Sequence, residues 1–228
     1  MGIAIQNMFD GIARRYDFLN HFLSAGRDRS WRRKAARCLD GGISARVLDL
    51  CGGTGDFWKT YVDWKEASGT RPFGVIADFS LPMLLEARRK FDAPPIVRMD
   101  ALKPCFKPGS FDVVLCAYGM RNLDSVAAGM HEIRGLLKAG GMFVTLEFFR
   151  PSTAFTRLFY NGLAPLSIPF LGWFFSSRRQ AYAYLVDSIR KFKSADEYGD
   201  CARVHGFKDI NVIPCDFGIS HIVTAVKG

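Results

Sequence analysis

The clearest structural signal in this chain is the segment Val47-Leu48-Asp49-Leu50-Cys51-Gly52-Gly53-Thr54-Gly55. The apolar run at its start predicts a short buried strand, and the glycines predict a sharp turn that a ligand can approach closely. A helix that begins after such a turn offers the positive end of its dipole to that ligand. The stretch therefore predicts the first strand, turn and helix of an α/β ligand-binding domain.

Four more apolar runs follow, with helical stretches between them. They cover residues 73–77, 96–99, 111–117 and 142–148. Because each run is apolar on both faces, the pattern predicts a mostly parallel sheet with helices on both sides. The stretch 126–137 predicts one of these helices, and Gly140 closes it.

Two more strands are predicted near the end of the sequence, at residues 210–213 and 219–226, and we expect them to form a hairpin. The helix before them begins at a capping box of Ser194 and Glu197 and stops at Gly206. The expected fold is thus α/β, with a mostly parallel seven-stranded sheet of the Rossmann-like kind.

The first forty residues predict a helical lid. Residues 8–25 space their apolar side chains by three and four, which indicates one amphipathic helix. Residues 27–37 contain six basic residues around Trp31, so we expect a second helix with a cationic outer face. We interpret residues 1–228 as one domain with four parts: the lid (1–40), a cofactor-binding core (45–150), an apolar substrate or membrane insertion (151–193), and a C-terminal helix and hairpin (194–228).

Composition narrows the possible partners. The chain has 228 residues, 49% hydrophobic and 23% charged, with a formal charge of +9. These values exclude a disordered, collagen-like or coiled-coil protein. The basic charge favours a polyanionic partner, either nucleic acid or an anionic membrane surface. The six cysteines show no C-x-x-C or zinc-finger spacing, so we expect free thiols in a reducing compartment and no metal site.

The segment Leu158–Phe175 carries no charge. Its length, about 18 residues, raises the question of a membrane-spanning helix, but Pro165 and Pro169 argue against one continuous helix. We expect an insertion that lies at a membrane interface or covers the substrate, with an ordinary buried connection as the alternative.

The glycine turn distinguishes between two cofactors. A dinucleotide needs G-x-G-x-x-G to seat its pyrophosphate on the helix, and Gly52, Gly53 and Gly55 do not fit that spacing. S-adenosylmethionine (SAM) has no phosphate. It needs room beside the turn for its ribose and amino-acid part, with an acidic residue such as Asp49 to brace it. The spacing therefore favours SAM over a nicotinamide cofactor.

Two more acids stand where later strands end. Asp78 follows the second strand, where its carboxylate can accept both ribose hydroxyls of the cofactor. Asp100 follows the third strand, where it can accept from the adenine amino group while Ala101 lies beside the ring. Ligands of open α/β sheets bind at these carboxyl ends, so Asp49, Asp78 and Asp100 should line one site.

At this point the sequence resembles the ubiquinone/menaquinone biosynthesis C-methyltransferases (UbiE/MenG), which are SAM-dependent class I methyltransferases. The resemblance covers nearly the whole chain. Its matching blocks are Met8–Asp10, Arg15–Asp17 with Asn20, Val47–Asp49, Gly53–Asp56, Asp78–Ser80 with Met83, Asp100-Ala101, Gly119–Asn122, Leu146–Phe148, and Ala181–Leu185 with Ser188–Arg190. The Gly119–Asn122 and Ala181–Arg190 blocks are specific to this family. Val223 departs from it, because the family tends to place a His there.

The resemblance implies further site residues and an activity. Thr54, Phe79 and Met83 would join the cofactor site. The implied reaction moves a methyl group from SAM to a ring carbon of a prenylated quinol and leaves S-adenosylhomocysteine (SAH). The acceptor would be demethylmenaquinol, or 2-polyprenyl-6-methoxy-1,4-benzoquinol, or both.

Carbon methylation needs an activated ring. A ring carbon is a poor nucleophile until a neighbouring hydroxyl ionises, and such a phenol has a pKa of about 10. Arg121 stays protonated, so we expect it to stabilise the phenolate or orient a water. We predict a catalytic cluster of Arg121, Asn122 and Tyr16, with Asp17 as the obvious carboxylate base nearby.

The lipid tail of the acceptor would explain the basic segment at residues 27–37 and the apolar segment Leu158–Phe175. We expect the enzyme to be cytoplasmic and attached peripherally to the inner face of the membrane, with residues 27–37 on anionic lipid. A homodimer is left open, and no nucleic acid is expected. The alternatives are a methyltransferase of RNA or another small molecule, and a non-catalytic SAM-binding member of a quinone-biosynthesis complex.

Overall fold

The computed structural model describes residues 3–39, 45–158, 160, 162 and 179–228. Within this part of the chain, seven strands form one sheet in the order β3-β2-β1-β4-β5-β7-β6. The strands are β1 (Arg46–Leu50), β2 (Phe73–Asp78), β3 (Ile96–Arg98), β4 (Phe111–Ala117), β5 (Leu137–Glu147), β6 (Phe207–Cys215) and β7 (Ser220–Lys227). All neighbours are parallel except β7, which runs antiparallel to both β5 and β6. The predicted seven-stranded, mostly parallel sheet is confirmed.

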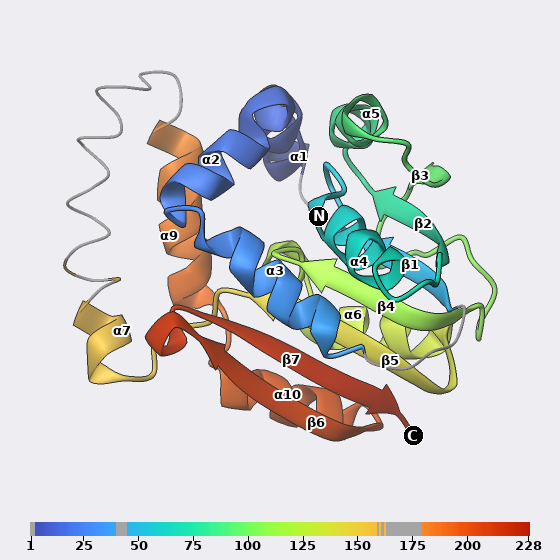
Figure 1. The fold of residues 1–228 in the computed structure, drawn as a ribbon. Helices are drawn as coiled ribbons and strands as arrows, with labels where there is room; N and C mark the ends of the chain where they lie inside the picture. Colours follow the sequence, from blue (N-terminus) through green and yellow to red (C-terminus); the bar gives the residue numbers. More distant parts are fainter. Residues whose placement is uncertain (1–2, 40–44, 159, 161, 163–178) are drawn as a thin grey trace.

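Helices cover both faces of the sheet (Figure 1). One face carries α3 (Arg27–Arg37), α4 (Asp56–Glu66) and α5 (Leu81–Lys90), and the other carries α6 (Val126–Leu136) and α10 (Ala195–Val204). Strand β4 shows why: Val113 and Leu115 pack toward α3–α5, whereas Val114 and Cys116 pack toward α6 and α10. Alternate residues of a strand point to opposite faces, so an unbroken apolar run fills two cores.

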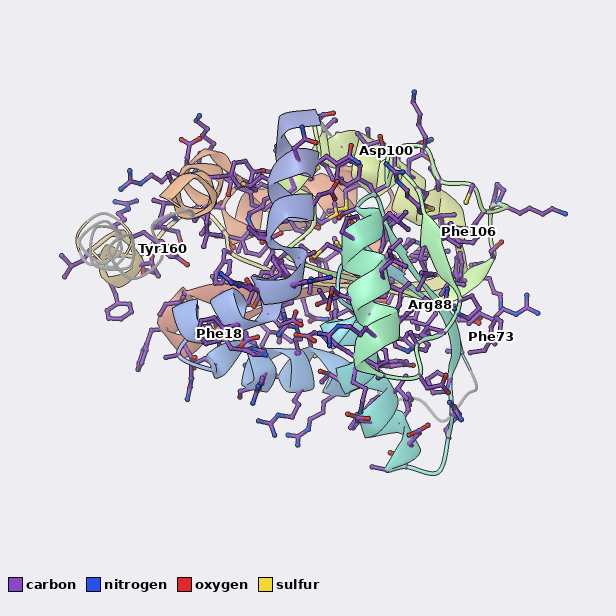
Figure 2. The ribbon with its side chains drawn as sticks, turned by 90° about the horizontal axis from the view of Figure 1, so that it is seen from above. Phe18, Phe73, Arg88, Asp100, Phe106 and Tyr160 are labelled. Atoms are coloured by element: carbon purple, nitrogen blue, oxygen red, sulfur yellow. The ribbon has the colours of Figure 1, made fainter. Side chains whose placement is uncertain are left out.

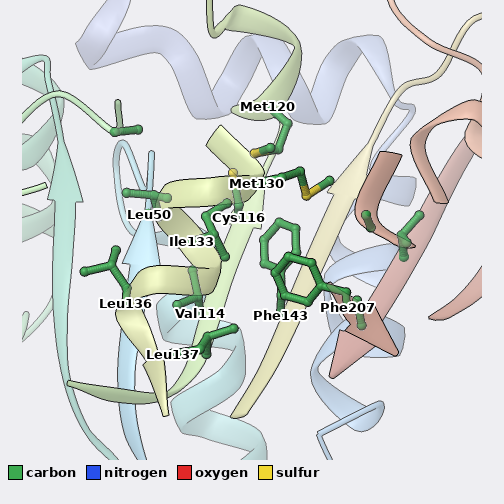
Figure 3. Close-up of a cluster of buried hydrophobic side chains, with 14 of the residues drawn as sticks. Leu50, Val114, Cys116, Met120, Met130, Ile133, Leu136, Leu137, Phe143 and Phe207 are labelled. Atoms are coloured by element: carbon green, nitrogen blue, oxygen red, sulfur yellow. The ribbon is translucent and has the colours of Figure 1, made fainter. Parts of the chain in front are cut away.

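Figure 3 shows the core beneath α6 and α10. Phe143 of β5 and Phe207 of β6 place their ring centroids 6.1 Å apart, and Met130 and Ile133 of α6 are fully buried there. This core holds the carboxyl end of β4 in place, and β4 leads directly into the predicted catalytic block.

The first part of the N-terminal lid is two helices, and the prediction of one helix over residues 8–25 was wrong. Helix α1 (Ile3–Ile12) and helix α2 (Tyr16–Leu23) are joined by a 3₁₀ turn at Ala13–Arg15. The turn redirects the chain, so that Asp10 on α1 and Asp17 on α2 meet different parts of the core. Both helices lie above the sheet in Figure 1.

Other helix and strand boundaries differ from the prediction. At Leu137 the reason is that strand pairing outweighs local helix periodicity. Leu137 was expected to end a helix, but it pairs with Phe111 of β4 and begins β5. Met99 and Phe148 fall just outside their strands, and β6 begins earlier than predicted. The capping box of Ser194 and Glu197 is confirmed at the start of α10.

The apolar segment Leu158–Phe175 lies outside the described residues, apart from Leu158, Tyr160 and Gly162. It is flanked by α7 (Ala154–Leu158) and α9 (Arg179–Lys191). The Tyr160 hydroxyl donates to the Ile219 carbonyl at 2.9 Å, and seen from above Tyr160 lies at the opposite end of the molecule from Phe106 (Figure 2). In the described part of the chain, no helix has the length and apolar character needed to cross a membrane. The four-part division of the domain stays a prediction.

Candidate active site

A cavity of about 820 Å³, including its open mouth, lies at the carboxyl ends of β1, β2, β3 and β4. The strand order reverses between β1 and β4, which is where open α/β sheets bind ligands. Ten of the predicted site residues line it: Tyr16, Asp49, Gly53, Thr54, Asp78, Phe79, Met83, Asp100, Ala101 and Asn122. Two others, Gly55 and Arg121, do not belong to its lining.

The turn after β1 needs its glycines for two different reasons. At Gly52 an added Cβ would lie 2.8 Å from Cγ of Asp49 and 2.9 Å from its carbonyl oxygen. Gly53 and Gly55 have φ of 54° and 76°, in the left-handed region that glycine tolerates. A Cβ on Gly55 would also lie 2.6 Å from the Phe91 ring. Gly55 therefore shapes the turn and the start of α4, and its contact with the cofactor stays a prediction.

Asp49 lies at the bottom of the cavity and is fully buried. Its Oδ2 accepts from the Trp58 N–H at 3.1 Å, while its Oδ1 has no hydrogen-bond partner. Burial raises the pKa of Asp49 to about 7. One carboxylate oxygen is thus left for a donor or a cation that enters the cavity.

Asp78 is held by backbone groups at the end of β2. Its Oδ2 accepts from the Gly53 N–H at 3.0 Å and its Oδ1 accepts from the Ser80 N–H at 2.8 Å. Burial raises the pKa of Asp78 to about 6, although these N–H groups favour the ionised form. The acid therefore ties the glycine turn to the start of α5.

Asp100 lies two residues beyond the end of β3. Its Oδ1 accepts from the Leu102 N–H at 2.9 Å. In the view from above, Asp100 is labelled at the upper edge of the molecule, above Arg88 (Figure 2). The structure thus brings Asp49, Asp78 and Asp100 into one cavity, each fixed by the backbone.

Arg121 lies beside this cavity in a buried ion pair. It belongs to a 3₁₀ turn at Met120–Asn122, and its side chain is 6% exposed. Its Nη1 donates to Glu147 Oε1 at 2.5 Å and to the Tyr118 carbonyl at 3.0 Å. Burial lowers the pKa of Arg121, but the Glu147 carboxylate together with the nearby Tyr16 and Tyr184 hydroxyls outweighs burial, and the pKa is raised. The guanidinium is therefore a cation that its ion pair with Glu147 holds in a fixed position.

Asn122 connects the cavity to α9. Its Nδ2 donates to the Tyr118 carbonyl at 3.0 Å, and its Oδ1 accepts from the Tyr184 hydroxyl at 2.9 Å. Tyr118 has a φ of 58° and stacks on Phe148 with ring centroids 4.8 Å apart. The amide of Asn122 is therefore held at both ends.

Tyr16 stands at the first residue of α2 and closes the cavity from the lid side. Its ring meets Phe9 edge to face at 6.0 Å. Burial raises the pKa of Tyr16, against the smaller lowering effects of the Asn20 side chain and the Arg121 charge, so the phenol stays protonated and can donate. Asp17, the expected carboxylate base, is already engaged: it accepts from the Thr54 hydroxyl and pairs with Lys90 at 2.6 Å.

Three cavity or pocket-edge residues were missed from the sequence: Arg32, Tyr118 and Glu147. Arg32 was expected on the cationic outer face of α3, but it is 4% exposed and lines the cavity. Trp31 and Ala35 of the same helix are buried too, so helical spacing from them could have placed Arg32 on the inner face. No sequence signal indicated that Glu147 is the partner of Arg121.

Comparison with known proteins identifies the family to which this chain belongs. A profile of the ubiE/COQ5 methyltransferase family matches residues 2–227. The ubiquinone/menaquinone biosynthesis C-methyltransferase UbiE of Geobacter sulfurreducens is 37% identical over 100% of this chain and 90% of the relative. The demethylmenaquinone methyltransferase of Chlorobaculum tepidum is 34% identical over 98% of this chain and 92% of its own length.

Solved structures share the fold at lower identity. A SAM-dependent methyltransferase from Thermotoga maritima superposes with a TM-score of 0.66 at 18% identity, over 97% of this chain and 99% of the other. Human N-acetylserotonin methyltransferase, solved in complex with SAM, gives a TM-score of 0.64 at 15% identity, over 97% of this chain and 59% of that one. At these identities the likeness shows the class I methyltransferase fold.

Proposed function

This chain belongs to the ubiE/COQ5 methyltransferase family and is a SAM-dependent methyltransferase, and from that premise we propose that it methylates a ring carbon of a prenylated quinol. The product would be menaquinol if the acceptor is demethylmenaquinol, which is our first choice. The methoxy-benzoquinol acceptor of the ubiquinone branch is the second.

The residues of the cavity fit SAM. The unpartnered Oδ1 of Asp49 suits the cationic amino group of the cofactor, and the fixed carboxylates of Asp78 and Asp100 suit its ribose and adenine. The close approach of Asp49 and Ile76 leaves no room for a side chain at Gly52. When bound, SAM supplies a methyl group on a positively charged sulfur, which a carbon nucleophile can take without acid assistance.

The residues beside the cavity fit an ionising phenol. The Arg121 cation can stabilise a phenolate, and the protonated hydroxyl of Tyr16 can donate to the same oxygen. Glu147 holds the Arg121 guanidinium at a fixed position, which spares the reaction the cost of arranging it. Asn122 is itself fixed by the Tyr118 carbonyl and the Tyr184 hydroxyl. Positioning of the ring carbon then supplies much of the rate.

One observation carries the proposal. The two sequence blocks that set this family apart, Gly119–Asn122 and Ala181–Arg190, meet at the cavity through the hydrogen bond between Asn122 and Tyr184. A methyltransferase of another substrate class would need the glycine turn and the three acids, but it would have no need for this second contact.

The test is transfer of labelled methyl from SAM to two dithionite-reduced acceptors, demethylmenaquinol and 2-polyprenyl-6-methoxy-1,4-benzoquinol. We expect label in the naphthoquinol product. Label in the benzoquinol alone would move the enzyme to the other branch, and label in both would mean that it serves either. Label in neither, with SAH still bound, would reject the quinol assignment in favour of RNA or another small molecule. Failure of SAH to bind would contradict the cofactor site itself.

We also propose that the enzyme meets its acceptor at an anionic membrane surface. Helix α3 exposes Arg29, Arg33, Lys34 and Arg37, and these cations fit lipid phosphates. A prenyl tail remains in the bilayer, so an enzyme that methylates its head group has to approach that surface. The homodimer left open from the sequence stays a prediction.

A further inference from the structure

Three buried side-chain atoms that line the cavity, within the described residues, have no hydrogen-bond partner: Asp49 Oδ1, Arg32 Nε and the Tyr118 hydroxyl. Two of them belong to groups of opposite charge. A buried donor or acceptor without a partner costs free energy, so such atoms mark where a ligand would complete the site. A pair of opposite sign calls for a ligand that carries both signs.

The guanidinium of Arg32 is braced on one side and open on the other. Its Nη1 donates to Asp28, which is itself buried, and lies 3.9 Å from Asp56 Oδ2. Its Cζ lies 5.6 Å from the centroid of the Tyr118 ring. Asp28 is fixed in turn by His21, whose Nδ1 lies 2.7 Å from the carboxylate. Arg32 is thus a preorganised cation whose Nε is free to bind an anion.

The amino-acid end of SAM carries both signs, a carboxylate and an ammonium on one carbon atom. We propose that Arg32 binds the cofactor's carboxylate through its free Nε edge, while Asp49 receives the ammonium. A guanidinium binds a carboxylate through parallel N–H donors, which gives geometric fit as well as charge. Arg32 would then be a cofactor-binding residue contributed by the lid segment. The inference rests on SAM dependence and is independent of the acceptor.

The experiment compares two ligands that differ by the carboxylate alone: SAH and decarboxylated SAH, measured by calorimetry with the full chain. In Arg32→Gln we expect SAH affinity to fall about 10- to 100-fold, the range for a hydrogen-bonded charge, and the affinity for decarboxylated SAH to change less than twofold. Arg33→Gln, an exposed neighbour on α3, is the matched control and should bind both ligands as the unchanged protein does. Equal losses for both ligands, or no loss for either, would overturn the proposal.

Arg32→Gln leaves the buried Asp28 without its cation, so the variant can lose stability for that reason. The double variant Asp28→Asn/Arg32→Gln replaces the ion pair with a neutral pair and keeps the comparison possible. In either variant the measured quantity is the affinity for SAH divided by the affinity for decarboxylated SAH. We expect this ratio to fall, because neither variant keeps the guanidinium that binds the carboxylate. An unchanged ratio in the double variant overturns the proposal. This comparison of affinities does not depend on methyl transfer. Failure of quinol methylation would therefore reject the proposed acceptor without affecting the proposed role of Arg32.

Discussion

At the scale of single residues, the buried pair of Arg121 and Glu147 makes simple substitutions hard to interpret. Both side chains are withdrawn from water, and loss of one partner leaves the other charge unpaired. Such losses cost about 3–5 kcal/mol of stability. An inactive Arg121→Ala variant could therefore be a destabilised protein rather than one that lacks a catalytic group.

A paired substitution separates these effects. We expect Arg121→Ala to lower kcat for the quinol by about 10²- to 10³-fold, the range for loss of a transition-state charge stabiliser, with SAH affinity within threefold of the starting value. Arg121→Gln/Glu147→Gln should unfold near the starting temperature, because the pair stays neutral and hydrogen bonded. If its kcat stays low, the Arg121 charge acts in catalysis. Recovery of kcat along with stability would make the role structural.

The raised pKa values of Asp49 and Asp78 predict how cofactor binding depends on pH. Burial raises these pKa values to about 7 and about 6, so both acids gain protons as the pH falls from 7 to 5. A ligand that needs the carboxylates ionised must displace those protons, so its affinity falls with falling pH. Its own α-amino group, with a pKa of about 8, stays mostly protonated in this range.

We expect SAH to bind more weakly at pH 5 than at pH 7, by about tenfold on account of Asp78 and by about fiftyfold on account of Asp49. Calorimetry over this range measures it, with circular dichroism as the check that the protein stays folded. Asp78→Asn should bind weakly at every pH and show a shallower dependence. A dependence as steep as that of the unchanged protein would mean that Asp78 does not titrate with binding.

At the scale of elements, two carboxylates fasten the lid to the core. Asp10 on α1 accepts from the hydroxyl of Ser80, the N-cap of α5, and Asp17 on α2 accepts from Thr54 in the glycine turn. Asp17 also pairs with Lys90 at the end of α5. The contacts are made from α1 and from α2, so we expect them to hold these two helices over the bound cofactor.

Removal of both anchors should therefore loosen the lid more than it weakens the fold. In Asp10→Ala/Asp17→Ala we expect SAH to dissociate about tenfold faster in a stopped-flow experiment, equivalent to about 1.4 kcal/mol of lost lid contact. The melting temperature without ligand should change little, since Asp17 and Lys90 are partly exposed. Asp63→Ala, which breaks the exposed pair with Lys59, is the control. Equal dissociation rates in all three proteins would contradict a covering role.

The elements that sequence predicted well are those whose signal is local. The strand at residues 111–117 was found with its bounds intact, because its apolar run is buried on both faces. Leu137 was misplaced because its strand partner, Phe111, is 26 positions away. The turn that divides the lid was missed because it serves contacts made by Asp10 and Asp17 with distant residues.

The same distinction explains the site. The sequence could bring Asp49, Asp78 and Asp100 to one cavity because each lies at or near the carboxyl end of a strand, and these ends meet at one edge of a parallel sheet. Arg32 was hidden in a basic run that predicts a solvated helix face, although one of its cations turns inward. Glu147 was hidden because a lone acid at a strand end does not indicate which arginine it will meet.

At the scale of the whole molecule, the inward turn of Arg32 changes how the charge of α3 should be understood. One basic residue of this helix lines the cofactor cavity, while Arg29, Arg33, Lys34 and Arg37 remain on the surface. A single short helix thus borders the site and carries a cationic face. Such an arrangement would bring the cavity close to an anionic bilayer that holds the acceptor.

Flotation with liposomes tests this arrangement. We expect the protein to float with vesicles of phosphatidylcholine and phosphatidylglycerol at low salt, and to stay behind with phosphatidylcholine alone. Each lysine or arginine near an anionic surface contributes about 1 kcal/mol, so Arg29→Gln/Arg33→Gln/Arg37→Gln should lose most of the binding. Lys103→Gln/Lys107→Gln/Lys208→Gln removes the same charge from exposed sites elsewhere and should float normally. Equal losses in both variants would show that net charge, and not the face of α3, governs attachment, and no flotation at low salt would remove the membrane proposal altogether.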